Sequence, residues 1–186
     1  RAREAVEGVV EATFDAWHLL SSGRQPVMAV LGVPSVVPVD AEARDEARLW
    51  ESVLWDTWLR ALGDGEFALP WKAAVDRPDL QGIVDLVGIV ADHPVGIDRH
   101  GAFHPHPVDG RADGSGFCPV PEELGVVLRR VHEALPDHDL VVAATGVGTS
   151  DDDWRDELLT ATVDQVESAV ADGVPVTGLF HDSLVD

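Results

Sequence analysis

Apolar residues along the chain follow two patterns, the 3.6-residue period of helices and the continuous runs of strands that are buried on both faces. Helical periodicity predicts helices at residues 3–21, 40–62, 121–135 and 151–171. Continuous apolar runs predict strands at residues 26–33, 83–90, 139–144 and 174–180. A loop rich in glycine, histidine and proline, at about residues 93–119, separates the two halves of this series.

Residues at the ends of these segments support the predicted boundaries. Gly23 suits the end of the first helix, Asp40 is a candidate N-cap, and Pro121 suits a first helical turn. Ser150 and the three aspartates that follow it are expected to open the last helix, because carboxylates favour the positive end of the helix dipole. Glu122 and Glu123 are interpreted in the same way, as charges at the start of the helix at 121–135. Helices that alternate with buried strands predict a parallel α/β sheet, either a barrel or a doubly wound sheet, with its strands neighbouring in chain order.

The composition fits one globular domain with a negatively charged surface. The chain has 186 residues, of which 45% are hydrophobic, and its 34 acidic and 13 basic residues give a net charge of −21. This charge excludes nucleic acid and anionic membranes as expected partners, because contact with phosphates needs a basic face.

Cysteine content and hydropathy indicate the compartment. Cys118 is the single cysteine, so no intrachain disulfide can form, and no apolar run reaches the roughly 18–20 residues of a membrane span. The sequence also shows no signal peptide. We therefore expect a cytoplasmic protein, and we read Cys118 as a small loop residue rather than a nucleophile.

Two motifs suggest ligands but lack the required context. The turn Thr-Gly-Val-Gly-Thr-Ser at 145–150 has neither the lysine nor the spacing of a phosphate loop, so we interpret its glycines as turn residues and expect no cofactor. Asp98, His100, His104 and His106 lie close together in sequence, as zinc ligands do. Their spacing suits a helix, however, and the neighbouring prolines argue against one, so we predict no metal site.

Six segments resemble, in the same order, parts of one enzyme family. Leu140–Thr149 reads Leu-Val-Val-Ala-Ala-Thr-Gly-Val-Gly-Thr and resembles a strand that ends in Thr-Glu-Asn-Gly. The other five segments are residues 16–40, 49–67, 84–90, 120–135 and 172–186. Together they resemble glycoside hydrolase family 1, the β-glucosidase family of (β/α)8 barrels.

The resemblance implies a partial domain that spans residues 1–186. It would be the C-terminal half of a TIM barrel, holding strands five to eight, and its partner would be the missing N-terminal half, which carries the acid/base glutamate of the family. Both ends of the sequence are read as cut. The implied substrate class is a β-glycoside, a small carbohydrate.

Matched residue by residue, the resemblance places Ala144 at the position of the family nucleophile. An alanine methyl group cannot attack an anomeric carbon, so the chain is expected to be inactive as given. Val90 and Ala91 stand where the family has an asparagine and a tyrosine, and Asp182 stands in place of a tryptophan.

Four other residues are candidates for a changed or substrate-binding site. Asp92 follows the second predicted strand, and His181 and Asp182 follow the fourth, so all three are expected on the side where strands end. Trp71 is the best candidate for a sugar platform, because it lies in a loop. The other tryptophans occur at helical spacing and are interpreted as packing residues.

Three functions remain open at this point. The chain is part of a glycosidase-like protein, or it is part of a non-catalytic relative that binds sugar or protein, or it belongs to a different enzyme that uses Asp92, His181 and Asp182.

Overall fold

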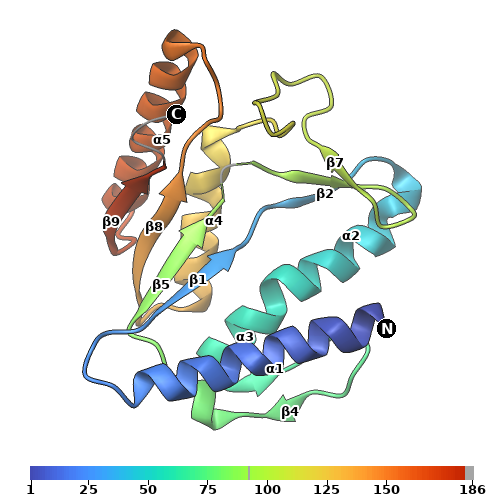
Figure 1. The fold of residues 1–186 in the computed structure, drawn as a ribbon, viewed down its shortest axis with the longest axis vertical. Helices are drawn as coiled ribbons and strands as arrows, with labels where there is room; N and C mark the ends of the chain where they lie inside the picture. Colours follow the sequence, from blue (N-terminus) through green and yellow to red (C-terminus); the bar gives the residue numbers. More distant parts are fainter. Residues whose placement is uncertain (92, 183–186) are drawn as a thin grey trace.

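The main sheet of this computed structural model has the topology predicted from the sequence. The structure describes residues 1–91 and 93–182, and within them four parallel strands stand in chain order (Figure 1). They are β1 (Met28–Gly32), β5 (Leu86–Val90), β8 (Asp139–Thr145) and β9 (Val176–His181). This confirms the predicted strand order and the predicted parallel pairing.

The helices occupy the predicted segments. They are α1 (Ala2–Ser21), α2 (Arg44–Glu51), α3 (Thr57–Gly63), α4 (Pro121–Ala134) and α5 (Asp152–Ala171). The predicted helix at 40–62 is one continuous helical run, but a 3₁₀ turn, η1 (Ala41–Ala43), opens it and a π turn, η2 (Ser52–Asp56), divides α2 from α3. Among the described residues, no helix is long and apolar enough to cross a lipid bilayer.

Side chains cap two of these helices. Asp40 accepts hydrogen bonds from the backbone N–H groups of Glu42 and Ala43, which confirms the predicted cap. At α5 the cap is Asp151, whose carboxylate accepts from the N–H of Trp154 at 3.1 Å. The helix therefore begins one residue later than Ser150 suggested.

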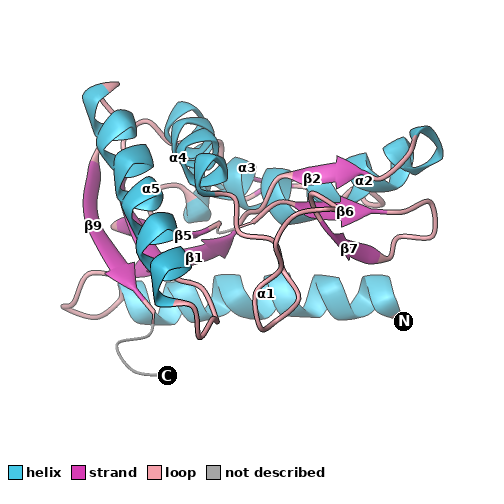
Figure 2. Cartoon of the chain, turned by 90° about the horizontal axis from the view of Figure 1, so that it is seen from above, coloured by secondary structure: helices cyan, strands magenta, loops and turns pink. Residues whose placement is uncertain are grey.

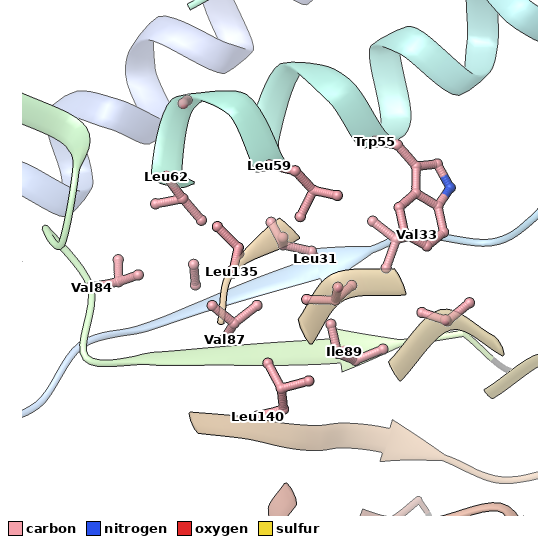
Figure 3. Close-up of a cluster of buried hydrophobic side chains, with 14 of the residues drawn as sticks. Leu31, Val33, Trp55, Leu59, Leu62, Val84, Val87, Ile89, Leu135 and Leu140 are labelled. Carbon is pink, nitrogen blue, oxygen red and sulfur yellow. The ribbon is translucent and has the colours of Figure 1, made fainter. Parts of the chain in front are cut away.

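One face of the sheet packs against the helices. Val87, Ile89 and Leu140 are fully buried and face side chains of α3 and α4 (Figure 3). Burying each such side chain contributes roughly 1.5–3 kcal/mol. Helices α4 and α5 pack against each other along this side (Figure 2).

The opposite face of the sheet is apolar and uncovered within the described chain. A Cβ built on Gly88 would lie 3.1 Å from Met28 Sδ, Val30 Cγ2 and Ala143 Cβ, so these side chains share one face. Met28 is 37% exposed, Val30 51% and Phe180 62%. We call this the open face, and it would form the interior if the sheet closed into a barrel.

Short strands occur where the sequence suggested only loops. The segment at 93–119 contains β6 (Val95–Ile97) and β7 (Phe103–Pro105), which pair with each other and, through β6, with β2 (Val36–Pro38). A further pair, β3 (Glu66–Phe67) and β4 (Val75–Asp76), precedes the 3₁₀ turn η3 (Pro78–Leu80). Strands of two or three residues are too short to show periodicity, so the prediction of a loop over the whole of about 93–119 missed β6 and β7.

Candidate functional site

The C-terminal ends of the four parallel strands meet at one edge of the sheet, where α/β proteins place their ligands. At this edge β8 ends at Thr145 and β9 ends at His181, and these two residues are paired in the sheet. The backbone N–H of Asp182 donates a hydrogen bond to the carbonyl oxygen of Thr145 at 2.8 Å. The last residues of both strands are therefore held together by the backbone.

Gly146 allows this close approach. A Cβ built on Gly146 would collide with the carbonyl oxygen of Asp182 and would lie 2.9 Å from its carbonyl carbon. Gly148 uses its own carbonyl oxygen to accept a hydrogen bond from the N–H of Gly114 at 2.7 Å. The glycines at 145–150 therefore serve the turn, as predicted, and they allow backbone segments to touch.

The last three residues of β8, Ala143, Ala144 and Thr145, include no carboxylate, imidazole or thiol. Ala143 lies on the open face, and Ala144 follows it where the register between β8 and β9 shifts, between Val142 and Thr145. Ala144 is half-buried and Thr145 is buried. The match of Ala144 to a nucleophile remains a prediction.

His181 and Asp182 lie at the end of β9 and are both exposed. His181 lines a small cavity together with Thr145, Gly146 and Leu158. This cavity has a volume of about 20 Å³, which holds about one water molecule and no sugar ring. Asp92 lies outside the described residues, so its pairing with Asp182 stays a prediction.

Trp71 lies away from these residues, beside the N-terminal part of α1. Its indole N–H donates to Glu7 Oε1 at 2.8 Å, and the guanidinium of Arg3 lies 5.4 Å from its ring centroid. Trp71 and His181 line different cavities. The structure therefore brings His181 and Asp182 together and places Trp71 elsewhere.

Several of the other tryptophans are packing residues, as predicted. Trp55 is fully buried, and its indole N–H donates to the carbonyl oxygen of Pro34 at 2.9 Å. Trp17 and Trp58 pack edge to face at 6.0 Å beside Phe14.

The histidine-rich segment forms a hairpin that Asp98 organises. Asp98 Oδ1 accepts from the N–H groups of His100 and Ala102, and Oδ2 pairs with His104 Nε2 at 3.0 Å. The bond to His104, followed by the two backbone N–H groups, lowers the pKa of Asp98 to about 2. Within the described residues, no three histidine, cysteine or acidic side chains are grouped as metal ligands.

Two ionisable residues near the strand ends, His93 and Glu123, were not among the predicted site residues. His93 stacks on Phe117 with ring centroids 4.2 Å apart, and burial lowers its pKa, while Asp113 and Glu123 act in the opposite direction. Glu123, in the first turn of α4, is buried and accepts from the N–H of Ser35 at 2.6 Å.

The sequence reasoning had treated Glu123 as a charge at a helix start. Its place in the first turn of α4 was right, but the structure buries it. The signal was present, because Glu123 lies four residues before Val127, on the buried face of this helix.

Comparison with known proteins identifies the architecture. No family model matches the chain, and no curated protein matches its sequence. Solved structures do match. The β-glycosidase of Pyrococcus horikoshii superposes with a TM-score of 0.77 at 21% identity, over 97% of this chain and 43% of that protein. The β-glycosidase of Thermosphaera aggregans gives 0.76 at 19% identity, over 97% and 40%.

A third match is the β-glucosidase of Thermotoga maritima in complex with a methyl acetic acid-substituted glucoimidazole. Its TM-score is 0.71 at 21% identity, over 97% of this chain and 46% of that protein. The chain has the fold of part of a β-glycosidase.

This β-glycosidase fold confirms the predicted resemblance and the predicted partial barrel. The chain spans 40–46% of the length of these three proteins. Active sites of (β/α)8 barrels lie at the C-terminal ends of the strands. Ala144, His181 and Asp182 lie at this end of β8 and β9.

Proposed function

We propose that this chain supplies the sugar-facing edge of a β-glycosidase-like barrel that binds a β-glycoside without hydrolysing it by double displacement. One observation carries the proposal. A chain that matches the β-glycosidase fold over 97% of its length ends β8 with Ala143, Ala144 and Thr145.

The chemistry of hydrolysis explains why this observation matters. A retaining glycosidase needs two carboxyl groups about 5–5.5 Å apart, one as the nucleophile and one as the acid/base. Methyl groups at the end of β8 cannot form the glycosyl–enzyme bond. Sugar binding does not need that bond, because hydroxyl groups are held by hydrogen bonds and ring faces by apolar contact.

The barrel needs further strands to close. The open face exposes Met28, Val30 and Phe180, and β1 and β9 stand at the two ends of the strand order. Uncovered strand edges and apolar faces favour association. We propose that the partner is the other half of the barrel, which is supported by the 40–46% coverage of the matched proteins.

The test restores the missing group in a complete barrel. A fusion joins the upstream part of the Pyrococcus horikoshii β-glycosidase to this chain, and hydrolysis of an activated aryl β-glucoside is measured. The fusion should be inactive, and Ala144→Glu should raise the rate about 10²-fold or more, on the scale of one catalytic group.

Ala143→Glu is the matched control, because it places the same carboxylate one residue earlier on β8. If Ala143→Glu raises the rate of hydrolysis and Ala144→Glu does not, the nucleophile position is residue 143 rather than residue 144. Full activity of the unsubstituted fusion would refute the proposal.

A further inference from the structure

A pocket on the outside of the barrel wall lies between the N-terminal part of α1 and the helical run of α2 and η2. Its volume is about 220 Å³, and its walls include Val6 of α1, Leu49 and Trp50 of α2, and Val53 of η2. Trp71 completes the apolar lining. These residues differ from those that line the strand-end cavity, so the pocket is a separate place on the molecule.

Both tryptophan rings in this pocket are fixed by contacts outside it. The Trp71 indole is held by its hydrogen bond to Glu7, whose carboxylate also pairs with Lys72 at 2.6 Å. The Trp50 ring packs against Phe103 with centroids 4.8 Å apart at 63°. Aromatic side chains that are already oriented lose little conformational freedom when a ligand binds.

A hydrogen-bond donor and an acceptor meet at one lip of the pocket. A Cβ built on Gly101 would lie 3.4 Å from both Glu46 Oε2 and Trp50 Nε1, so these two atoms approach the same point. Neither atom has a hydrogen-bond partner in residues 1–91 and 93–182. A hydroxyl group both donates and accepts, so a single hydroxyl suits this pair.

The charges around the pocket favour a neutral ligand. Arg3 and Glu46 both line it, together with His100, so charges of both signs are present and neither a cation nor an anion is selected. The volume is below the roughly 300–1,000 Å³ of sites for drug-sized ligands, which indicates one small ring. Apolar aromatic surface beside a hydroxyl-binding pair matches a pyranose, which has C–H groups on its faces and hydroxyls at its edge.

We propose that this pocket binds one hexopyranose unit, as a second carbohydrate site separate from the strand-end cavity. The choice of a sugar rests on the proposed function, whereas the pocket and its polar pair do not. The position on the outer wall would let the protein hold one sugar unit of a carbohydrate chain while another sugar unit lies at the strand-end edge.

The test is a titration of the ¹⁵N-labelled 186-residue chain with methyl β-D-glucopyranoside, followed by NMR. The six indole N–H signals are assigned with single Trp→Phe variants. Trp50 and Trp71 should shift together and saturate, with a dissociation constant on the order of 1 mM, as expected for so small a ligand. The indole of Trp154, a residue of α5 whose ring packs against the Arg111 guanidinium, should keep its chemical shift.

Two substitutions on the same helix form the matched pair. Glu46→Gln should weaken binding about tenfold, because it removes the charged acceptor at the lip. Asp45→Asn removes the neighbouring carboxylate, which does not line the pocket, and should leave binding unchanged. If Glu46→Gln fails to fold, as judged by loss of the dispersed NMR spectrum, Trp50→Phe is used instead. This substitution removes the indole N–H donor and keeps an aromatic ring in the pocket.

The outcomes separate this site from the strand-end site. If the sugar does not shift the Trp50 and Trp71 indole signals, the second site is overturned. This holds even if the backbone N–H signals of Thr145 and Gly146 shift, which would support binding at the strand ends. Equal binding by Glu46→Gln and the parent would also overturn it, as would shifts caused by tetramethylammonium but not by the sugar. Shifts of Trp50 and Trp71 without those of Thr145 and Gly146 would support the second site and count against the first.

Discussion

Replacing Gly146 by alanine should open the ends of β8 and β9, whereas the same change at Gly148 should not. The two glycines lie two residues apart in one turn. A Cβ on Gly146 collides with the backbone carbonyl of Asp182, and backbone cannot move aside as a flexible side chain does. A Cβ on Gly148 meets nothing nearer than 3.9 Å. The pair therefore has matched chemistry and opposite steric consequences.

The magnitude follows from the contacts that Gly146→Ala disturbs. Moving the Asp182 backbone away breaks its hydrogen bond to Thr145, which contributes about 0.5–1.5 kcal/mol. Distortion of the last residues of β9 adds to this, so we expect a total loss of about 2–4 kcal/mol, in the range of strongly destabilising substitutions. Gly148→Ala should be neutral or should stabilise by up to about 1 kcal/mol, because alanine restricts the unfolded chain.

Urea unfolding and amide hydrogen exchange measure the two effects. The midpoint should fall for Gly146→Ala alone, and the Asp182 N–H should lose its protection in that variant. Equal stability of the two variants, with protection of Asp182 unchanged, would refute the close approach of β8 and β9 and with it the geometry of the strand-end edge.

Three further predictions follow from the described contacts. Glu123→Ala should destabilise by about 1–3 kcal/mol in urea unfolding, because the Ser35 N–H loses its buried acceptor, while Glu123→Gln and the exposed Glu122→Ala should change little; equal losses at 122 and 123 would contradict this. Asp98 has a folded-state pKa of about 2, below its unfolded value of about 3.9, so its contribution to stability is present above about pH 4 and is lost as the pH falls toward 2. Urea midpoints of the parent and Asp98→Asn should therefore converge over that range, and a constant difference would argue against the His104 pairing. Trp55→Phe should destabilise more than Trp154→Phe, because only Trp55 is fully buried and bonds Pro34; equal melting temperatures would show that the Pro34 contact contributes nothing.

The sequence predicted the sheet well because its signals are long and consistent. Each of the four main strands is a continuous apolar run, and each comes after a helical segment in the chain. By contrast, β6 and β7 are three residues each in a segment of glycine, histidine and proline, where pairing is decided by distant Val36–Pro38 rather than by local pattern. The π turn at Ser52–Asp56 leaves the hydrophobic pattern nearly unchanged, so periodicity could not reveal it.

The candidate site was predicted less completely, since burial of polar groups depends on tertiary neighbours. Ala144, His181 and Asp182 lie at the strand ends, as their positions after apolar runs suggested. Trp71, the predicted sugar platform, does not join this group, because its indole bonds Glu7 of α1 and it lines a different pocket. Glu123 does start a helix, as predicted, but the pattern did not reveal that it is buried and accepts a hydrogen bond from the Ser35 N–H.

The anchoring of β8 in the core does not depend on the residues at its C-terminal end. Leu140 and Val142 of β8 are fully buried among the helices and hold the strand in place. Ala143 and Ala144 come after these anchors and are only half-buried, so they contribute little to the core. A carboxylate at residue 144 would be partly desolvated beside the methyl group of Ala143 and would lower stability unless a partner held its charge. Alanine at residue 144 carries no such cost, and it leaves the anchors, Gly146 and the Asp182–Thr145 hydrogen bond in place. The residues that anchor β8 in the core and the residues at its C-terminal end therefore occupy successive positions of the same strand and can change independently.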